Sequence, residues 1–205
     1  FGAVVGYSKT GKVENNRLTI SGDASIADVF GGETETGSVS GNQVTILAGS
    51  VGSAKGGYAG FGGMVTGNTL KIEGGTIGSA IGGGSGTNGS TSVTATDNTL
   101  EITGGTITGT ITSTIIAAGG WAGGYDAAGT AARNRVKLSN GTVQGDLSGG
   151  VILKAGTAEA NTVDLISGTV GGNVYGGCSW WGSDNGSALN NTVNLYGITV
   201  GGTIY

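Results

Sequence analysis

Few residues of this chain could carry out acid–base or nucleophilic chemistry. The 205 residues include no His, so the single cysteine, Cys178, has no imidazole to activate its thiol. Without a cluster of Cys and His there is also no ligand set for a transition metal. Glu101 and Asp164 could form a carboxylate pair of the kind that polysaccharide-cleaving solenoids use, but a solvated row of alternating charges explains them better. The sequence therefore predicts a protein that is not an enzyme and has no cofactor and no metal.

The aromatic residues are better candidates for a functional role, namely ligand binding. Eleven of the twelve lie in or beside Gly-rich segments of variable length, which predicts that they line one long edge of the fold. Flat apolar rings at a surface suit sugar rings or a protein partner. The alternative is that they pack over these segments as small local cores. The candidate ligand-binding residues are Trp121 and Tyr125 in the longest segment, with Tyr175, Trp180 and Trp181 as the other wall.

These candidates are positioned by a repeat that fills the chain. The stretch NTVDLISGTVGGNVYGG, which begins at Asn161, returns thirty residues later as NTVNLYGITVGGTIY. A search for the opening Asn with branched apolar residues two and four positions on finds seven copies. They begin at Asn16, Asn42, Asn68, Asn98, Asn134, Asn161 and Asn191.

Each copy reads as a coil of short strands. Apolar and polar residues alternate in three groups separated by Gly, which is the signature of strands with one buried face. The copies are 26, 26, 30, 36, 27 and 30 residues apart, so a common unit of 22 residues leaves inserts of 4, 4, 8, 14, 5 and 8. These inserts are expected directly after a Gly-Gly pair. A slip of one residue near Ile26 predicts a β-bulge in the first copy.

A coil of 22 residues cannot bury its apolar face alone, so the coils must stack in parallel. The fold class is therefore all-β, a parallel β-helix (β-solenoid) of about seven coils of three short strands, forming one unit over residues 1–205. The seven Asn are expected to form a structural ladder, each at a left-handed bend and bonded to the amides above and below. Outward residues three positions later alternate in charge over four coils: Lys71, Glu101, Lys137 and Asp164. Lys55 is an exception, because it stands where the other copies carry an inward Val, Ile or Leu.

Composition narrows the functional classes. The chain holds 47 Gly, no Pro and 37% hydrophobic residues, which disfavours helices but suffices for a core. Its net charge is −4 and its Lys and Arg do not cluster, so no nucleic acid is expected as a partner. No apolar run approaches eighteen residues, so no direct membrane insertion of this segment is expected.

The repeat resembles the Gly-rich repeats in passenger domains of bacterial autotransporter adhesins, and the resemblance covers the whole chain. The residues that carry it are the pattern N-x-V-x-[IL], followed by G-T-V-x-G-x-[VI]-Y-G-G. It implies a right-handed β-helix, an extracellular location on the bacterial cell surface, and a stalk or adhesin that binds a glycan or a cell-surface protein. The signal peptide and membrane barrel of such proteins have no counterpart here, so the chain is expected to be an internal fragment.

Two other functional classes remain open. A structural extracellular filament would assemble end to end, and the matching phase of Phe1 and Tyr205 within the repeat is compatible with that form of self-association. A polysaccharide-active enzyme would need paired carboxylates in a cleft along the edge. Screening against a glycan array discriminates best among the three classes.

Overall fold

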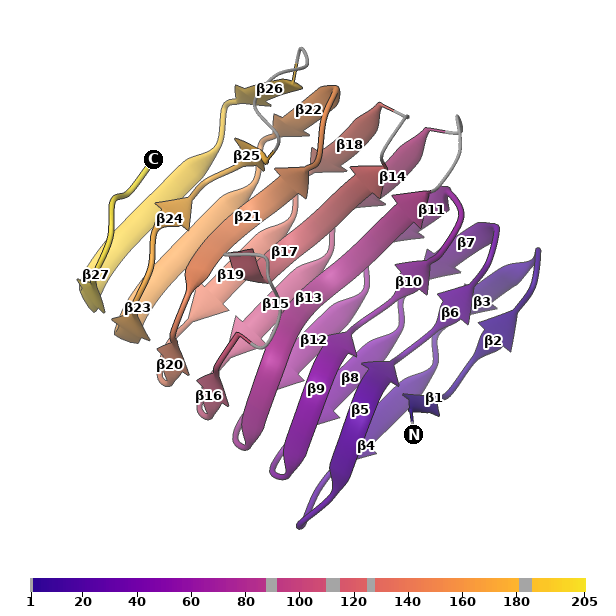
Figure 1. Ribbon diagram of the computed structural model, residues 1–205, viewed down its shortest axis with the longest axis horizontal. Coiled ribbons are helices and arrows are strands. Elements are labelled where there is room, and N and C mark those ends of the chain that lie inside the picture. The colour runs from indigo at the N-terminus through magenta and orange to yellow at the C-terminus, as the bar shows by residue number, and fades with distance from the viewer. Residues whose placement is uncertain (1, 88–91, 110–114, 125–127, 181–185) are drawn as a thin grey trace.

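The computed structural model describes residues 2–87, 92–109, 115–124, 128–180 and 186–205. All its regular elements are β-strands, paired in parallel and stacked as a solenoid of about seven turns. The two chain ends lie at opposite ends of the stack (Figure 1). The parallel β-solenoid predicted from the repeat is therefore confirmed.

Three faces run along the solenoid. The first face is a seven-stranded sheet of β3 (Lys12–Glu14), β7 (Gly37–Ser40), β11 (Gly63–Thr66), β14 (Val93–Thr96), β18 (Gly129–Ala132), β22 (Gly156–Glu159) and β26 (Gly186–Leu189). The second face consists of β4 (Arg17–Ile20), β8 (Gln43–Ile46), β12 (Thr69–Ile72), β15 (Thr99–Ile102), β19 (Arg135–Leu138), β23 (Thr162–Val170) and β27 (Thr192–Val200). Both β23 and β27 continue round the corner onto the third face.

The third face is turned toward the viewer in Figure 1. Its strand is continuous in the third coil and interrupted in the others. The strands are β1 (Ala3–Val4), β2 (Tyr7–Ser8), β5 (Ser25–Phe30), β6 (Glu33–Thr34), β9 (Ser50–Lys55), β10 (Tyr58–Ala59), β13 (Thr76–Thr87), β16 (Thr106–Ile107), β17 (Ile115–Gly124), β20 (Thr142–Val143), β21 (Asp146–Ile152), β24 (Val174–Tyr175) and β25 (Cys178–Ser179).

The core is built from columns of like residues. On the second face, Leu70 lies between Val44 and Leu100, and Ile72 lies between Ile46 and Ile102. All six are fully buried. A single coil buries little apolar surface, so these stacked contacts supply the hydrophobic stabilisation of the fold.

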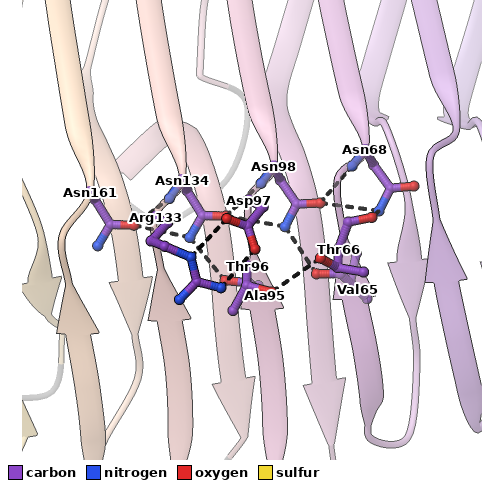
Figure 2. A network of polar contacts seen from close by, with 10 residues as sticks. All are labelled: Val65, Thr66, Asn68, Ala95, Thr96, Asp97, Asn98, Arg133, Asn134 and Asn161. Carbon is purple, nitrogen blue, oxygen red and sulfur yellow. Dashed lines mark hydrogen bonds and ion pairs between the residues drawn. The ribbon is translucent and has the colours of Figure 1, made fainter.

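The ladder Asn side chains form a continuous hydrogen-bonded column inside the solenoid (Figure 2). In the first six coils the Asn backbone N–H and Nδ2 both donate to Oδ1 of the Asn in the next coil, for example from Asn68 to Asn98 at 3.0 and 3.1 Å. From the second coil on, Nδ2 also donates to a carbonyl of the preceding coil, which for Asn68 is that of Val39, at 3.0 Å. These bonds satisfy amides that are fully buried in the middle coils.

At the corner between the first and second faces, the residue before each ladder Asn has the left-handed backbone conformation. The expectation that the Asn itself adopts that conformation was wrong. The preceding residues have φ between 51° and 64°, and they are Asn15, Gly41, Gly67, Asp97, Arg133, Ala160 and Asn190. Five of the seven are not Gly, so the corner tolerates side chains that rarely adopt this conformation. Asp97 and Arg133 use it to form a bidentate ion pair between neighbouring coils, with Nε–Oδ1 at 2.8 Å and Nη2–Oδ2 at 2.7 Å.

The Gly-Gly pairs are explained by the same column. A β-carbon on Gly57 would lie 2.7 Å from Cγ of Asn68, and one on Gly177 would lie 2.6 Å from Nδ2 of Asn191. The second Gly of each pair thus packs against the amide of the ladder Asn that follows it in the sequence. The Asn and the Gly-Gly pair therefore recur together because they contact each other in each coil.

The strand register corrects the interpretation of Lys55. Lys55 pairs with Phe30 and Ile81, whereas Ala54 occupies the inward column between Val29 and Ala80. Lys55 is therefore an outward residue of the third face, and the core has no charged defect at this coil. The repeat likewise predicts that Ile81 points inward, but Ile81 pairs with Lys55 on the outer side, and Ala80 occupies the inward column.

Two expectations about length changes were also wrong. No bulge occurs at Ile26, because the register from β5 to β9 is constant and the extra residue lies in the turn 21–24. Ile107 and Ala117 of the fourth coil pair with Ile77 and Ala80 of the third. Nine residues lie between the first two, but only two lie between their partners. Seven extra residues therefore precede the Gly-Gly pair of this coil instead of following it. The repeat also predicts an inward Ile111 in this coil, and this residue lies outside the described residues.

Candidate functional site

Three of the five candidate binding residues lie together on the third face. Trp121, Tyr175 and Trp180 pack, partly buried, against a cluster of Ile115, Ala118, Val151 and Cys178. For these three the alternative of a small local core describes the packing better than two open walls. The other two candidates, Tyr125 and Trp181, lie outside the described residues.

Trp121 belongs to the regular coil and not to an insert. It pairs with Gly84 on one side and with Val151 on the other, directly after the Gly-Gly pair of its own coil. Tyr175 pairs with Ser148 and stacks on Tyr205, with ring centres 5.0 Å apart and planes 4° from parallel.

A second aromatic group lies on the same face, two coils from Trp121. The rings of Phe30 and Tyr58 have their centres 5.6 Å apart, and the Lys55 ammonium lies 4.8 Å from the first centre and 4.4 Å from the second. A cation at this distance is attracted to the face of each ring. The Tyr58 ring also lies over Gly84, where a β-carbon would be 3.5 Å from Cδ2 of the tyrosine.

A pocket of about 270 Å³ lies between these two groups, with Tyr58 and Trp121 at its margins. Its lining residues come from three consecutive coils, and they are Ser53, Lys55, Tyr58, Ser79, Ile81, Gly84, Gly86, Ile115, Ile116, Ala117, Ala118 and Trp121. Gly84 separates Tyr58 from Trp121 in one column of paired residues, so no side chain of this column stands between the two rings. Ile115 and Ile116, from the end of the seven-residue insertion, line another part of it.

Of the residues that line this pocket, the sequence predicts a binding role for Trp121 alone. The outward position of Lys55 and the place of the insertion depend on the strand register, which the spacing of the repeat predicts wrongly by one residue at Lys55. The one sequence feature that could have indicated the pocket is the presence of two further glycines, Gly84 and Gly86, after a Gly-Gly pair.

Lys55 is the only charged residue among the described residues that line the pocket. Burial lowers the pKa of its ammonium, and the negative charges of Asp28 and Glu33 act in the opposite direction. No carboxylate forms an ion pair with Lys55 in the part of the chain that the structure describes. The positive charge of Lys55 is therefore stabilised by the faces of the Phe30 and Tyr58 rings and by long-range attraction to Asp28 and Glu33.

Cys178 belongs to the buried cluster on which Trp121, Tyr175 and Trp180 pack, called here the aromatic cluster, and its environment suppresses its reactivity. Burial raises the pKa of the thiol to about 11, although a contact of 3.6 Å with Oγ of Ser148 acts in the opposite direction. The thiolate that would act as a nucleophile is therefore scarce at neutral pH.

The predicted charge row is present on the second face, where Lys71, Glu101, Lys137 and Asp164 pair in this order. Glu101 contacts the Lys137 ammonium at 3.3 Å. Asp164 accepts hydrogen bonds from Arg135 at 2.6 Å and from Asn194 at 2.8 Å. Burial would raise the pKa of Asp164, but these hydrogen bonds outweigh it and hold the pKa below its usual value. Each carboxylate is thus held by a cation.

No group of three or more His, Cys, Asp or Glu side chains is arranged to hold a metal within the described ranges. The same residues contain no helix that could cross a membrane. No protein-family model, no curated protein and no solved structure matches this chain.

Proposed function

We propose that this chain is a segment of a bacterial cell-surface adhesin, of the autotransporter passenger type, that binds a glycan on one face of a stiff stalk. The observation that carries the proposal is the pocket between Tyr58 and Trp121. Its mostly apolar lining with a few polar groups is typical of small-molecule sites. Aromatic side chains beside hydroxyl groups are suited to the apolar face and the hydroxyls of a sugar ring.

The scaffold supports this role. Each wall of the pocket belongs to a strand hydrogen-bonded on both sides, so the rings are held on rigid elements and binding costs little conformational entropy. The solenoid as a whole serves as a spacer that holds the site away from the cell.

A glycan array with the 205-residue chain tests the proposal. We expect a defined set of glycans to bind, and Trp121→Ala to weaken that binding at least tenfold, as for loss of a central aromatic contact. Tyr196→Ala is the matched control, because Tyr196 is exposed on the second face, far from the pocket in the sheet order. Failure to bind any glycan would contradict the proposal and leave a protein partner as the alternative ligand.

A further inference from the structure

The pocket combines one cation with small hydroxyl groups and apolar walls, and this combination points to a particular kind of sugar. We propose that it binds a pyranose ring that carries a carboxylate, such as a uronic or sialic acid residue of a glycan. The inference rests on the proposed glycan-binding function and specifies the ligand of the same site.

The volume limits the ligand to one ring. Sites for drug-sized ligands span roughly 300–1,000 Å³. The pocket here, at about 270 Å³, lies just below that range and fits a single sugar unit, with the rest of the glycan outside.

The charge of the pocket selects an anion. Lys55 lines the pocket beside Tyr58, and it has lost part of its hydration without gaining a carboxylate partner within the described residues. A buried ammonium gains more from a charge-assisted hydrogen bond than an exposed one does. Asp28 and Glu33 belong to the preceding coil, and neither lines the pocket, so their negative charges favour the charged form of Lys55 without occupying the site.

The polar and apolar side chains of the remaining lining match the hydroxyl groups and the apolar face of such a sugar ring. Ser53 and Ser79 are paired across neighbouring strands, so two hydroxyl groups stand side by side to meet the ring hydroxyls. Ile81 and Ala118 are likewise paired neighbours and give an apolar surface beside Trp121. A carboxylate at Lys55 would thus place the apolar face of the sugar toward the indole.

The test compares acidic glycans with their own carboxyl-reduced forms. Oligosaccharides that end in glucuronate, galacturonate or sialate are measured against counterparts in which the carboxyl group is reduced to a primary alcohol. We expect at least one acidic form to bind about tenfold more tightly than its reduced form, which corresponds to one charge-assisted hydrogen bond. Lys55→Met keeps the aliphatic stem and should abolish this preference, whereas Lys55→Arg should retain it.

Lys71→Met is the control for general charge effects, since Lys71 lies on the second face and pairs with Glu73 at 2.8 Å. It should leave the preference unchanged. Equal binding of acidic and reduced glycans, or an acid preference that survives Lys55→Met, overturns this inference and leaves the glycan-binding proposal standing. If no glycan binds in either form, both proposals fall together.

Discussion

Gly57 and Asn68 lie so close together across the interior of the solenoid that a β-carbon on the glycine would be 2.7 Å from Cγ of the asparagine. The interior therefore has no room for a side chain on Gly57. The bonds of Asn68 to Val39 and Asn98 prevent the amide from moving aside.

Gly57→Ala should therefore destabilise the protein by about 1–3 kcal/mol, the usual cost of overpacking a rigid core. The measurement is the free energy of unfolding in urea. Gly60→Ala is the matched control, because its β-carbon would meet nothing nearer than 3.8 Å and its φ is not positive. A similar loss for both variants would mean that the cost is not steric.

The ladder can be tested in its middle. Asn98→Ala should cost on the order of 1–3 kcal/mol, because it leaves buried partners in the third and fifth coils without their hydrogen bonds. Gln43→Ala, at an exposed position on the second face, should change the unfolding free energy by less than about 0.5 kcal/mol. A loss below about 0.3 kcal/mol for Asn98→Ala would show that water replaces the lost bonds.

The left-handed corner predicts a substitution that stabilises the protein. Ala160 has φ of 51° and is exposed, so Ala160→Gly removes backbone strain without removing a contact. We expect a gain of about 0.5–1 kcal/mol, since the strain exceeds the entropic cost of the glycine.

The same substitution at an ordinary strand position should have the opposite sign. Ala27 is exposed in β5, where its φ is not positive, and Ala27→Gly should lose about 0.5–1 kcal/mol. Thermal unfolding of the two variants side by side measures the difference. A loss of stability for both Ala160→Gly and Ala27→Gly would show that the positive φ of Ala160 is not a source of strain.

Asp164 should make the stability depend on pH. Because its folded pKa is lowered, its contribution is present above the ordinary carboxyl pKa and is lost as the pH falls through the folded value. At pH 7, Asp164→Asn should cost about 1–3 kcal/mol, as for hydrogen bonds to a buried charge, and the difference from wild type should shrink on acidification.

Asp97→Asn is the comparison for Asp164→Asn. The pKa of Asp97 is lowered chiefly by its hydrogen bond from Arg133, but both side chains are about half exposed. Its loss should cost less than about 1 kcal/mol and should be weaker in high salt. Equal costs for the two aspartates would show that burial of Asp164 adds nothing.

Cys178 should be inert in the folded protein. With a pKa of about 11, its thiol is almost fully protonated at pH 8 and is shielded by the aromatic cluster. A thiol-reactive aromatic disulfide should label it slowly in the native state and within seconds in denaturant. Rapid labelling of the native protein would indicate that the cluster opens.

The sequence predicted features that repeat in every coil and missed those that occur in one. The Asn and Gly-Gly positions recur seven times or nearly so, and their spacing alone places them in columns. The outward position of Lys55 could not be predicted in this way, because a shift of one residue turns a side chain from one face of a strand to the other. The left-handed residues Arg133 and Ala160 carry no local signal either, since their conformation is imposed by the fixed corner around them.

The direction of the ladder bonds has a consequence for how damage spreads along the stack. Nδ2 of Asn68 is bonded both to Val39, one coil before, and to Asn98, one coil after, so one side chain joins three successive turns. Each of these bonds joins adjacent coils, but they meet on a single amide. Loss of one ladder Asn should therefore leave unpaired groups in both neighbouring coils and loosen the stack on both sides of the break.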